Sequence, residues 1–155
     1  MLSWFRRRRS EPTEAAASRG GLTIRTPWVR PDSVYPDRAG GYLTIVNADA
    51  EGDRLVGAST KVTAAVEIQG IRVAGGDIRM KAFPDGLAIP AGSTIVLRPH
   101  GYHLLLKGLA EPPAVGARVA MTLTFERTGA VEVDMVVEAP GHVGETVLDD
   151  NRHPA

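Results

Sequence analysis

The chain has 155 residues, 43% of them hydrophobic and 23% charged, and its formal net charge at pH 7 is zero. This length suits one domain with a real core, and the neutral charge balance gives no reason to expect nucleic acid or an anionic membrane as the main partner. Cysteine is absent, which excludes disulfides, thiolate metal sites and cysteine nucleophiles, so a soft-metal site would have to use methionine and histidine.

Residues 1–20 have the composition of a disordered tail. Trp4 and Phe5 precede the basic run Arg6–Arg9, and small polar residues follow. A secretory signal needs an apolar run of about 7–15 residues after its basic region, and none follows here. The sequence as written therefore predicts no export signal, no transmembrane span and a cytoplasmic location. A solvated disordered tail and a weak membrane-surface or partner contact are the two interpretations of the aromatic and basic residues.

Short extended segments separated by turn residues fill the chain from residue 21 to residue 139. They are, in order, 22–25, 28–30, 41–47, 54–58, 62–73, 77–83, 93–97, 101–109, 117–127 and 130–138. Gly75-Gly76 predicts a hairpin between two of them, and turns are expected at 84–86 and 89–92. No stretch of ten or more residues has helical periodicity. The sequence therefore predicts an all-β domain, an antiparallel sandwich or barrel, followed by a loose tail over 140–155.

Alternation assigns faces to three of these segments. In 101–109, His103, Leu105 and Lys107 share one face, and Tyr102, Leu104 and Leu106 share the other. In 117–127 and 130–138 the apolar residues recur at every second position, which makes Met121 and Met135 core residues instead of ligands. A lone histidine on a strand is either a satisfied structural residue or a ligand, and the segment alone leaves both interpretations open.

Several motifs of this chain, in this order, resemble the periplasmic copper chaperones of the PCu(A)C type. The resemblance extends over about residues 22–139 and rests on Trp28-Val29-Arg30, Gly41-Tyr42-Leu43-Thr44-Ile45-Val46-Asn47, Asp53-Arg54-Leu55-Val56, Gly86-Leu87-Ala88-Ile89-Pro90-Ala91-Gly92 and Gly101-Tyr102-His103-Leu104. It implies a cupredoxin-like antiparallel Greek-key β-sandwich. It also implies a Cu(I) site made of two histidines and two methionines, a donor set of soft thioethers and imidazoles that suits this ion.

Two of the four implied ligand positions keep a ligand. The methionine position falls on Met80, eleven residues after the first histidine position, and the second histidine falls on His103. The first histidine position holds Gln69, whose amide oxygen is a hard donor and a poor match for Cu(I). The second methionine position holds Leu105, which has no lone pair. Weakened or lost copper binding is therefore expected, because even the loss of an outer-shell partner costs about 10–100-fold in metal affinity.

Other residues are weaker candidates for the same site. His100, three residues before His103 in a predicted turn, is a candidate helper together with Gln69; an exposed turn histidine is the alternative interpretation. His142 and His153 lie in the predicted C-terminal tail, where some members of the family carry extra metal-binding residues. No nucleophile elbow, phosphate loop or acid–base set is present, so an enzyme is not expected.

Two functions follow from the resemblance and its departures. The first is a copper chaperone-like protein that binds Cu(I) through Met80 and His103 and exchanges it with a copper-donating or copper-accepting protein in the periplasm. The second is a metal-free divergent paralogue that keeps the sandwich and acts as a binding or interaction domain.

Overall fold

A computed structural model describes residues 15–141, and every regular element in that range is a β-strand. In chain order the strands are β1 (Ala15–Arg19), β2 (Leu22–Pro31), β3 (Ala39–Asn47), β4 (Asp53–Thr60), β5 (Ala65–Ala74), β6 (Asp77–Ala82), β7 (Leu87–Ile89), β8 (Thr94–Leu97), β9 (His103–Lys107), β10 (Arg118–Phe125) and β11 (Gly129–Val137). The all-β prediction is confirmed. The predictions for residues 1–14 and 142–155, including His142 and His153, lie outside the described residues.

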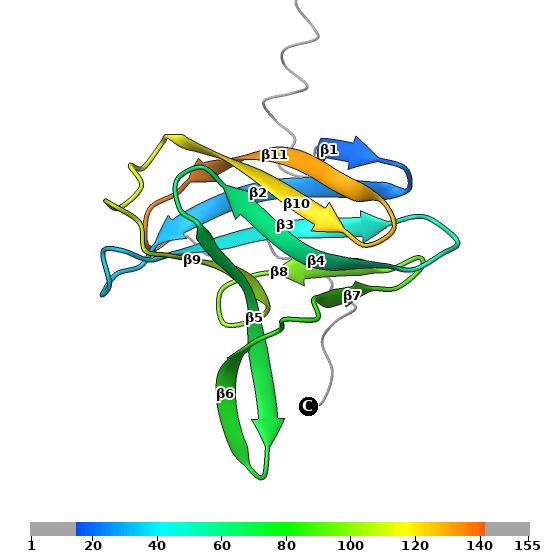
Figure 1. The fold of residues 1–155 in the computed structure, drawn as a ribbon, viewed down its shortest axis with the longest axis horizontal. Helices are drawn as coiled ribbons and strands as arrows, with labels where there is room; N and C mark the ends of the chain where they lie inside the picture. Colours follow the sequence, from blue (N-terminus) through cyan, green and yellow to red (C-terminus); the bar gives the residue numbers. More distant parts are fainter. Residues whose placement is uncertain (1–14, 142–155) are drawn as a thin grey trace, which may run out of the picture.

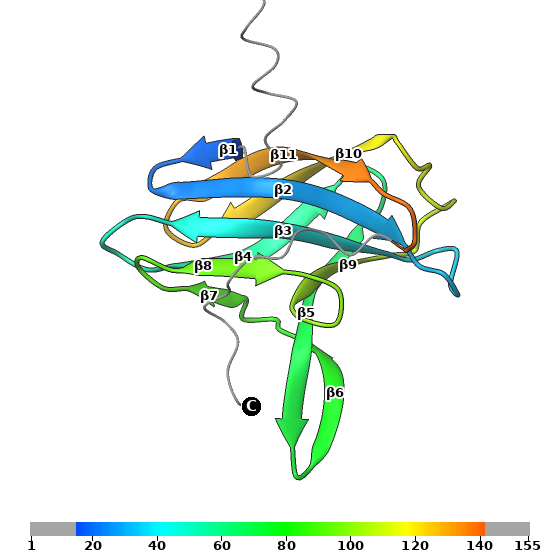
Figure 2. The ribbon, with the colours of Figure 1, turned by 180° about the vertical axis from the view of Figure 1, so that it is seen from behind.

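The strands form one curled sheet that folds over on itself into two layers. Its order is β6-β5-β9-β3-β2-β11-β10-β4-β7, with β1 paired to β2 and β8 paired to β3. In Figure 1 the layer with β4, β10 and β11 lies in front, and Figure 2 shows β1, β2, β3 and β8 from the other side. β2 and β11 pair in parallel, and the other described pairings are antiparallel. The sheet is therefore a mixed one, whose single parallel pairing among the described strands lies between β2 and β11.

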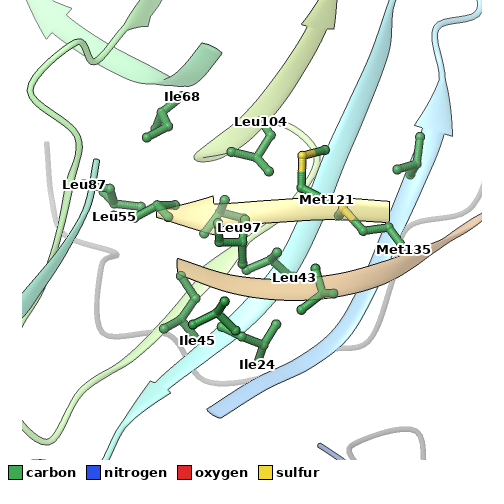
Figure 3. Packing of buried hydrophobic residues seen from close by; sticks show 14 of the residues in the cluster. Ile24, Leu43, Ile45, Leu55, Ile68, Leu87, Leu97, Leu104, Met121 and Met135 are labelled. Carbon is green, nitrogen blue, oxygen red and sulfur yellow. The ribbon is translucent and has the colours of Figure 1, made fainter. Parts of the chain in front are cut away.

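The core lies between the two layers and is built by the alternation that the sequence predicts. Met121 and Met135 are 1% and 0% exposed, and they lie among aliphatic side chains from both layers (Figure 3). Leu104 and Leu106 of β9 are fully buried, whereas His103, Leu105 and Lys107 on the opposite face are half-buried. The predicted faces of β9, β10 and β11 are therefore confirmed, and the His103 face of β9 points away from the core.

The structure differs from the sequence prediction at three strands. Residues 15–19, placed in the predicted tail, form β1, which pairs with β2. The predicted segments 22–25 and 28–30 are one strand, β2, whose register shifts between Arg25 and Trp28 near Thr26 with its φ of 49°. Leu87–Ile89, which was not predicted as a strand and whose last residue was placed in the turn at 89–92, is the short strand β7, which pairs with β4. Backbone pairing to a neighbouring strand, and not local propensity, explains β1 and β7.

The β5–β6 hairpin projects beyond the two layers and ends at the predicted glycine turn (Figures 1 and 2). Gly75 and Gly76 have φ values of 59° and 88°. A two-residue hairpin loop of this type requires positive φ at both positions, which glycine adopts without steric cost. The Gly75-Gly76 hairpin prediction is confirmed, and the turn sets the register that places Met80 on β6.

Candidate metal centre

The strand register brings the four implied ligand positions to one face of the sheet. Gln69 on β5 lies directly opposite His103 on β9 and opposite Ala82 on β6. Met80 is two residues from Ala82 on the same strand, so it shares the face of Gln69 and His103. Leu105, two residues beyond His103, lies on this face as well. We call this outer surface of β6, β5 and β9 the ligand face.

Met80 on β6 and His103 on β9 are separated by the strand β5. The length of the two side chains decides whether their donor atoms can bind the same ion. Two inter-strand spacings of ~4.8 Å and an offset of two residues put their Cα atoms ~12 Å apart on a flat sheet. With bonds of ~1.5 Å, each extended side chain carries its donor atom ~4–5 Å from Cα. Adding two metal–ligand bonds of ~2.0–2.3 Å spans ~12–14 Å. This span is the largest separation across which the two donor atoms could meet at one ion, and it requires both side chains to extend along the sheet over β5.

The turn before β9 orients the imidazole of His103. The Nδ1 atom of His103 lies 2.8 Å from the carbonyl oxygen of Gly101. A carbonyl oxygen only accepts hydrogen bonds, so Nδ1 carries the proton and donates it, and in the neutral ring the lone pair is on Nε2. The turn itself is held by the Gly101 amide donating to the Arg98 carbonyl at 3.0 Å. This is the arrangement by which proteins usually fix a metal-binding histidine.

The surroundings of His103 favour its neutral form. Burial lowers the pKa of His103, and the nearby positive charges of Arg30 and His100 lower it further, while the Gly101 hydrogen bond acts in the opposite direction. The ring of Tyr42 lies beside it, with the two ring centroids 6.2 Å apart. A metal ion competes with protons for the imidazole, so a lowered pKa keeps the Nε2 lone pair available near neutral pH.

Gln69 lies on the ligand face, and its side-chain amide takes part in a hydrogen-bond network with Glu67 and Lys107. Its Nε2 donates to Glu67 Oε1 at 3.0 Å, and the other oxygen of Glu67 accepts from Lys107 in an ion pair. The hydrogen bonds from Lys107 and Gln69 lower the pKa of the Glu67 carboxyl. The position where the resemblance implies a histidine thus belongs to a Lys107–Glu67–Gln69 network across β5 and β9.

Leu105 and His100 flank His103 in different ways. Leu105 is half-buried on the ligand face and opposite Glu67, at the position where the resemblance implies a thioether, and its hydrocarbon side chain cannot coordinate. His100 is exposed in the turn, with a φ of 67°, and it is close enough to His103 to influence its pKa. Among the described residues, no three His, Cys, Asp or Glu side chains converge as a metal site. The ligand face therefore offers the Met80 thioether and the His103 imidazole beside the hard oxygens of Glu67 and Gln69.

Two neighbours of His103 were not predicted as part of the site. Tyr42 stacks on Trp28 with centroids 4.5 Å apart, and the guanidinium carbon of Arg30 lies 5.7 Å from the Tyr42 ring centroid. Alternation along 41–47 does place Tyr42 on the face opposite Leu43 and Ile45, which is a usable signal. The pairing of β3 with β9 that brings Tyr42 to His103 is a tertiary feature with no local sequence signal.

Comparison with known proteins identifies the family. The model of the family described as putative lipoprotein LpqE-like matches residues 22–137. The chain belongs to the LpqE-like family. A putative lipoprotein of Leifsonia xyli subsp. xyli, Lxx21020, is 28% identical over 110 residues, which are 68% of this chain and 62% of that relative. In the described part of this LpqE-like chain no helix is long and apolar enough to cross a membrane.

Solved structures confirm the predicted PCu(A)C resemblance and the cupredoxin-like fold. The apo PCuAC domain of PmoF2 is 29% identical with a TM-score of 0.67, and the match covers 83% of this chain and 98% of that domain. The Cu(I) form of DR1885 from Deinococcus radiodurans is 30% identical with a TM-score of 0.58, covering 72% of this chain and 76% of that one. This LpqE-like chain is therefore similar in fold and sequence to a protein solved with Cu(I) bound.

Proposed function

We propose that this LpqE-like domain is a copper-handling protein that holds Cu(I) weakly between the Met80 thioether and the His103 imidazole. The observation that carries the proposal is the hydrogen bond from His103 Nδ1 to Gly101, which leaves the Nε2 lone pair on the face that Met80 shares. Thioether sulfur and imidazole nitrogen suit Cu(I) better than harder ions. The similarity to a structure in a Cu(I) form supports the choice of ion.

The proposed binding is weaker than that of a site with four ligands. Leu105 has no donor atom, and Gln69, whose Nε2 donates to Glu67, offers only a hard amide oxygen that suits Cu(I) poorly. Each missing ligand should cost at least about 10-fold in affinity, by comparison with losses from outer-shell changes alone. A weakly held ion suits exchange with a copper-donating or copper-accepting protein better than storage.

An exported location fits this proposal. The matching family and the Leifsonia xyli relative are both described as putative lipoproteins, and a copper-exchange partner of an exported protein would meet this domain outside the cytoplasm. Cell fractionation with a tagged full-length protein is expected to recover it with the cell envelope. Recovery in the soluble cytoplasmic fraction alone would contradict this part of the proposal.

The test of copper binding is a competition against a chromogenic Cu(I) chelator under reducing, oxygen-free conditions. The wild-type protein is expected to withdraw Cu(I) from the chelator when it is in excess, and Met80→Leu and His103→Ala should each lose about 10-fold or more of this affinity. Met121→Leu is the matched control, since it removes a buried thioether of the core at small cost. No competition by the wild type at a large excess would overturn the proposal.

The Lys107–Glu67–Gln69 network favours a second candidate function, a metal-free interaction domain. The network occupies part of the ligand face with charged and polar groups that are already satisfied by one another. A face used for protein contact would keep these groups and have no need of Met80. The same competition separates the two functions, because a metal-free domain gives identical null results for the wild type, Met80→Leu and His103→Ala.

A further inference from the structure

Met80 differs sharply from the other methionines of the described chain in its exposure. Its exposed fraction is 47%, against 1% for Met121 and 0% for Met135. It lies on β6, the terminal strand of the sheet order, in the hairpin that projects from the two layers (Figure 1). An oxidant in solution can therefore reach the thioether of Met80, while the core shields the other two.

Because Met80 lies on the ligand face, oxidation of its thioether would change the donor atoms of the proposed metal site. Within residues 15–141 it is the one methionine on the ligand face, because Met121 and Met135 point into the core. Oxidation converts a thioether into a polar, chiral sulfoxide. A sulfoxide presents a hard oxygen where Cu(I) prefers a soft sulfur donor. A single-atom change on Met80 would thus leave His103 without its soft partner.

We propose that Met80 is a redox-sensitive modification site, oxidised by hydroperoxides, and that its oxidation releases the metal from the ligand face. In the reaction a lone pair of the Met80 sulfur attacks one peroxide oxygen, the O–O bond breaks and an S–O bond forms. The displaced oxygen leaves with a proton as water or an alcohol, so sulfur loses two electrons and the peroxide gains two. The modification stands on exposure alone, and the release of metal rests on the proposed function.

The modification is tested on the intact protein with limiting hydrogen peroxide, followed by digestion and mass spectrometry of the methionine peptides. Met80 sulfoxide is expected to form at least about 10-fold faster than sulfoxide at Met121 or Met135, as reactivity follows access. In denaturant the three rates should converge, which shows that burial sets the difference. Equal rates in the native protein, or faster oxidation of a core methionine, would overturn the modification site.

The coupling to metal is tested with Ag(I), a soft ion that does not cycle with peroxide as copper does. Ag(I) is expected to slow Met80 oxidation in the wild type and to protect it clearly less in His103→Ala. Protein oxidised at Met80 should have the Cu(I) affinity of Met80→Leu. Selective oxidation of Met80 without protection by Ag(I) would remove the coupling and contradict the proposed metal site, leaving the modification intact. If all three methionines oxidised at the same rate while the wild type still bound Cu(I), the modification site would be contradicted and the proposed metal site would stand.

Discussion

At the scale of single residues, the ligand face is decided by what lies next to His103. The Gly101 carbonyl orients the imidazole, and Arg30, His100 and burial together lower its pKa. Two positions along β9, Leu105 supplies hydrocarbon where a donor would lie on the same face. The Gly101 carbonyl on one side of His103 and the Leu105 side chain on the other thus determine how well the site can hold a soft ion.

Leu105→Met should strengthen Cu(I) binding. The substitution restores a thioether two residues from His103 on the ligand face, and a leucine-to-methionine change conserves volume and usually costs less than about 1.5 kcal/mol. We expect a gain of at least about 10-fold in the chelator competition. Leu104→Met is the control, since the adjacent side chain points into the core. An equal gain in both variants, or none in Leu105→Met, would show that this face does not hold the ion.

The residues of the site could be predicted in part because alternation is a local property. It placed His103 opposite Leu104, and it assigned Met121 and Met135 to the core, as the structure has them. The Lys107–Glu67–Gln69 network could not be found in this way. It depends on which residues face each other across β5 and β9, and register between strands distant in sequence has no single-residue signal.

At the scale of elements, the β5–β6 hairpin is attached to the sandwich by packing on the face opposite the ligand face. Phe83, which follows β6, meets Tyr102 edge-to-face with ring centroids 5.5 Å apart. A Cβ at Gly70 would lie 2.4 Å from a ring carbon of Tyr102 and 2.9 Å from one of Phe83. The absence of a side chain at Gly70 is what lets the two rings close over β5.

Gly70→Ala is expected to loosen the hairpin and weaken metal binding together. The added methyl group overlaps both rings, and overpacking of this kind costs about 1–3 kcal/mol. Backbone amides of β6 should exchange with deuterium faster than in the wild type, and Cu(I) affinity should fall because a loosened hairpin no longer fixes Met80 on the ligand face. Gly57→Ala is the control, since a Cβ there meets nothing within 4 Å. Unchanged exchange in β6 would contradict this account of the hairpin.

Elements were predictable where chemistry specifies them locally. The Gly75-Gly76 turn could be predicted because both positions need positive φ, which glycine adopts. β1 could not be predicted, because Ala15-Ala16-Ala17-Ser18-Arg19 has no β-branched or aromatic residue and forms a strand through its pairing with β2. The parallel pairing of β2 with β11 was also missed, because it joins strands from the two ends of the domain.

At the scale of the whole molecule, Asp53 ties the start of β4 to the turn between β10 and β11. Its Oδ1 accepts hydrogen bonds from the amides of Arg54 and Arg127, both at 2.8 Å, and its Oδ2 accepts from the amide and hydroxyl of Thr128 at 3.1 and 2.6 Å. Burial acts to raise the pKa of Asp53, but the hydrogen bonds from Thr128, Arg127 and Arg54 outweigh it and lower the pKa. This carboxylate therefore links the ends of three strands of one layer.

The pKa of Asp53 makes the stability of the domain depend on pH in acid. A carboxyl whose pKa is lower in the folded than in the unfolded state stabilises the fold above its unfolded value of about 3.9, and this contribution is lost as the pH falls through the folded pKa. The hydrogen bonds to Asp32 and Glu67 also lower the pKa values of these carboxyls, so they act in the same direction. The melting temperature should begin to fall below about pH 6.5, because the lowered pKa of His103 leaves the unfolded state with more bound protons than the folded state, and it should fall further below about pH 4 as the carboxylates are protonated.

Asp53→Asn should lower the melting temperature at pH 7 and reduce its further fall in acid. The neutral amide loses the charge of the acceptor and cannot accept at both ends, at a cost of about 1–3 kcal/mol or about 3–10 °C. Asp134→Asn, an exposed carboxylate on β11, is the control and should leave the melting curve nearly unchanged. Calorimetry from pH 3 to pH 7 measures both effects. If Asp53→Asn lost as much stability between pH 5 and pH 3 as the wild type does, the acid sensitivity would have to reside in other carboxylates, because asparagine cannot titrate.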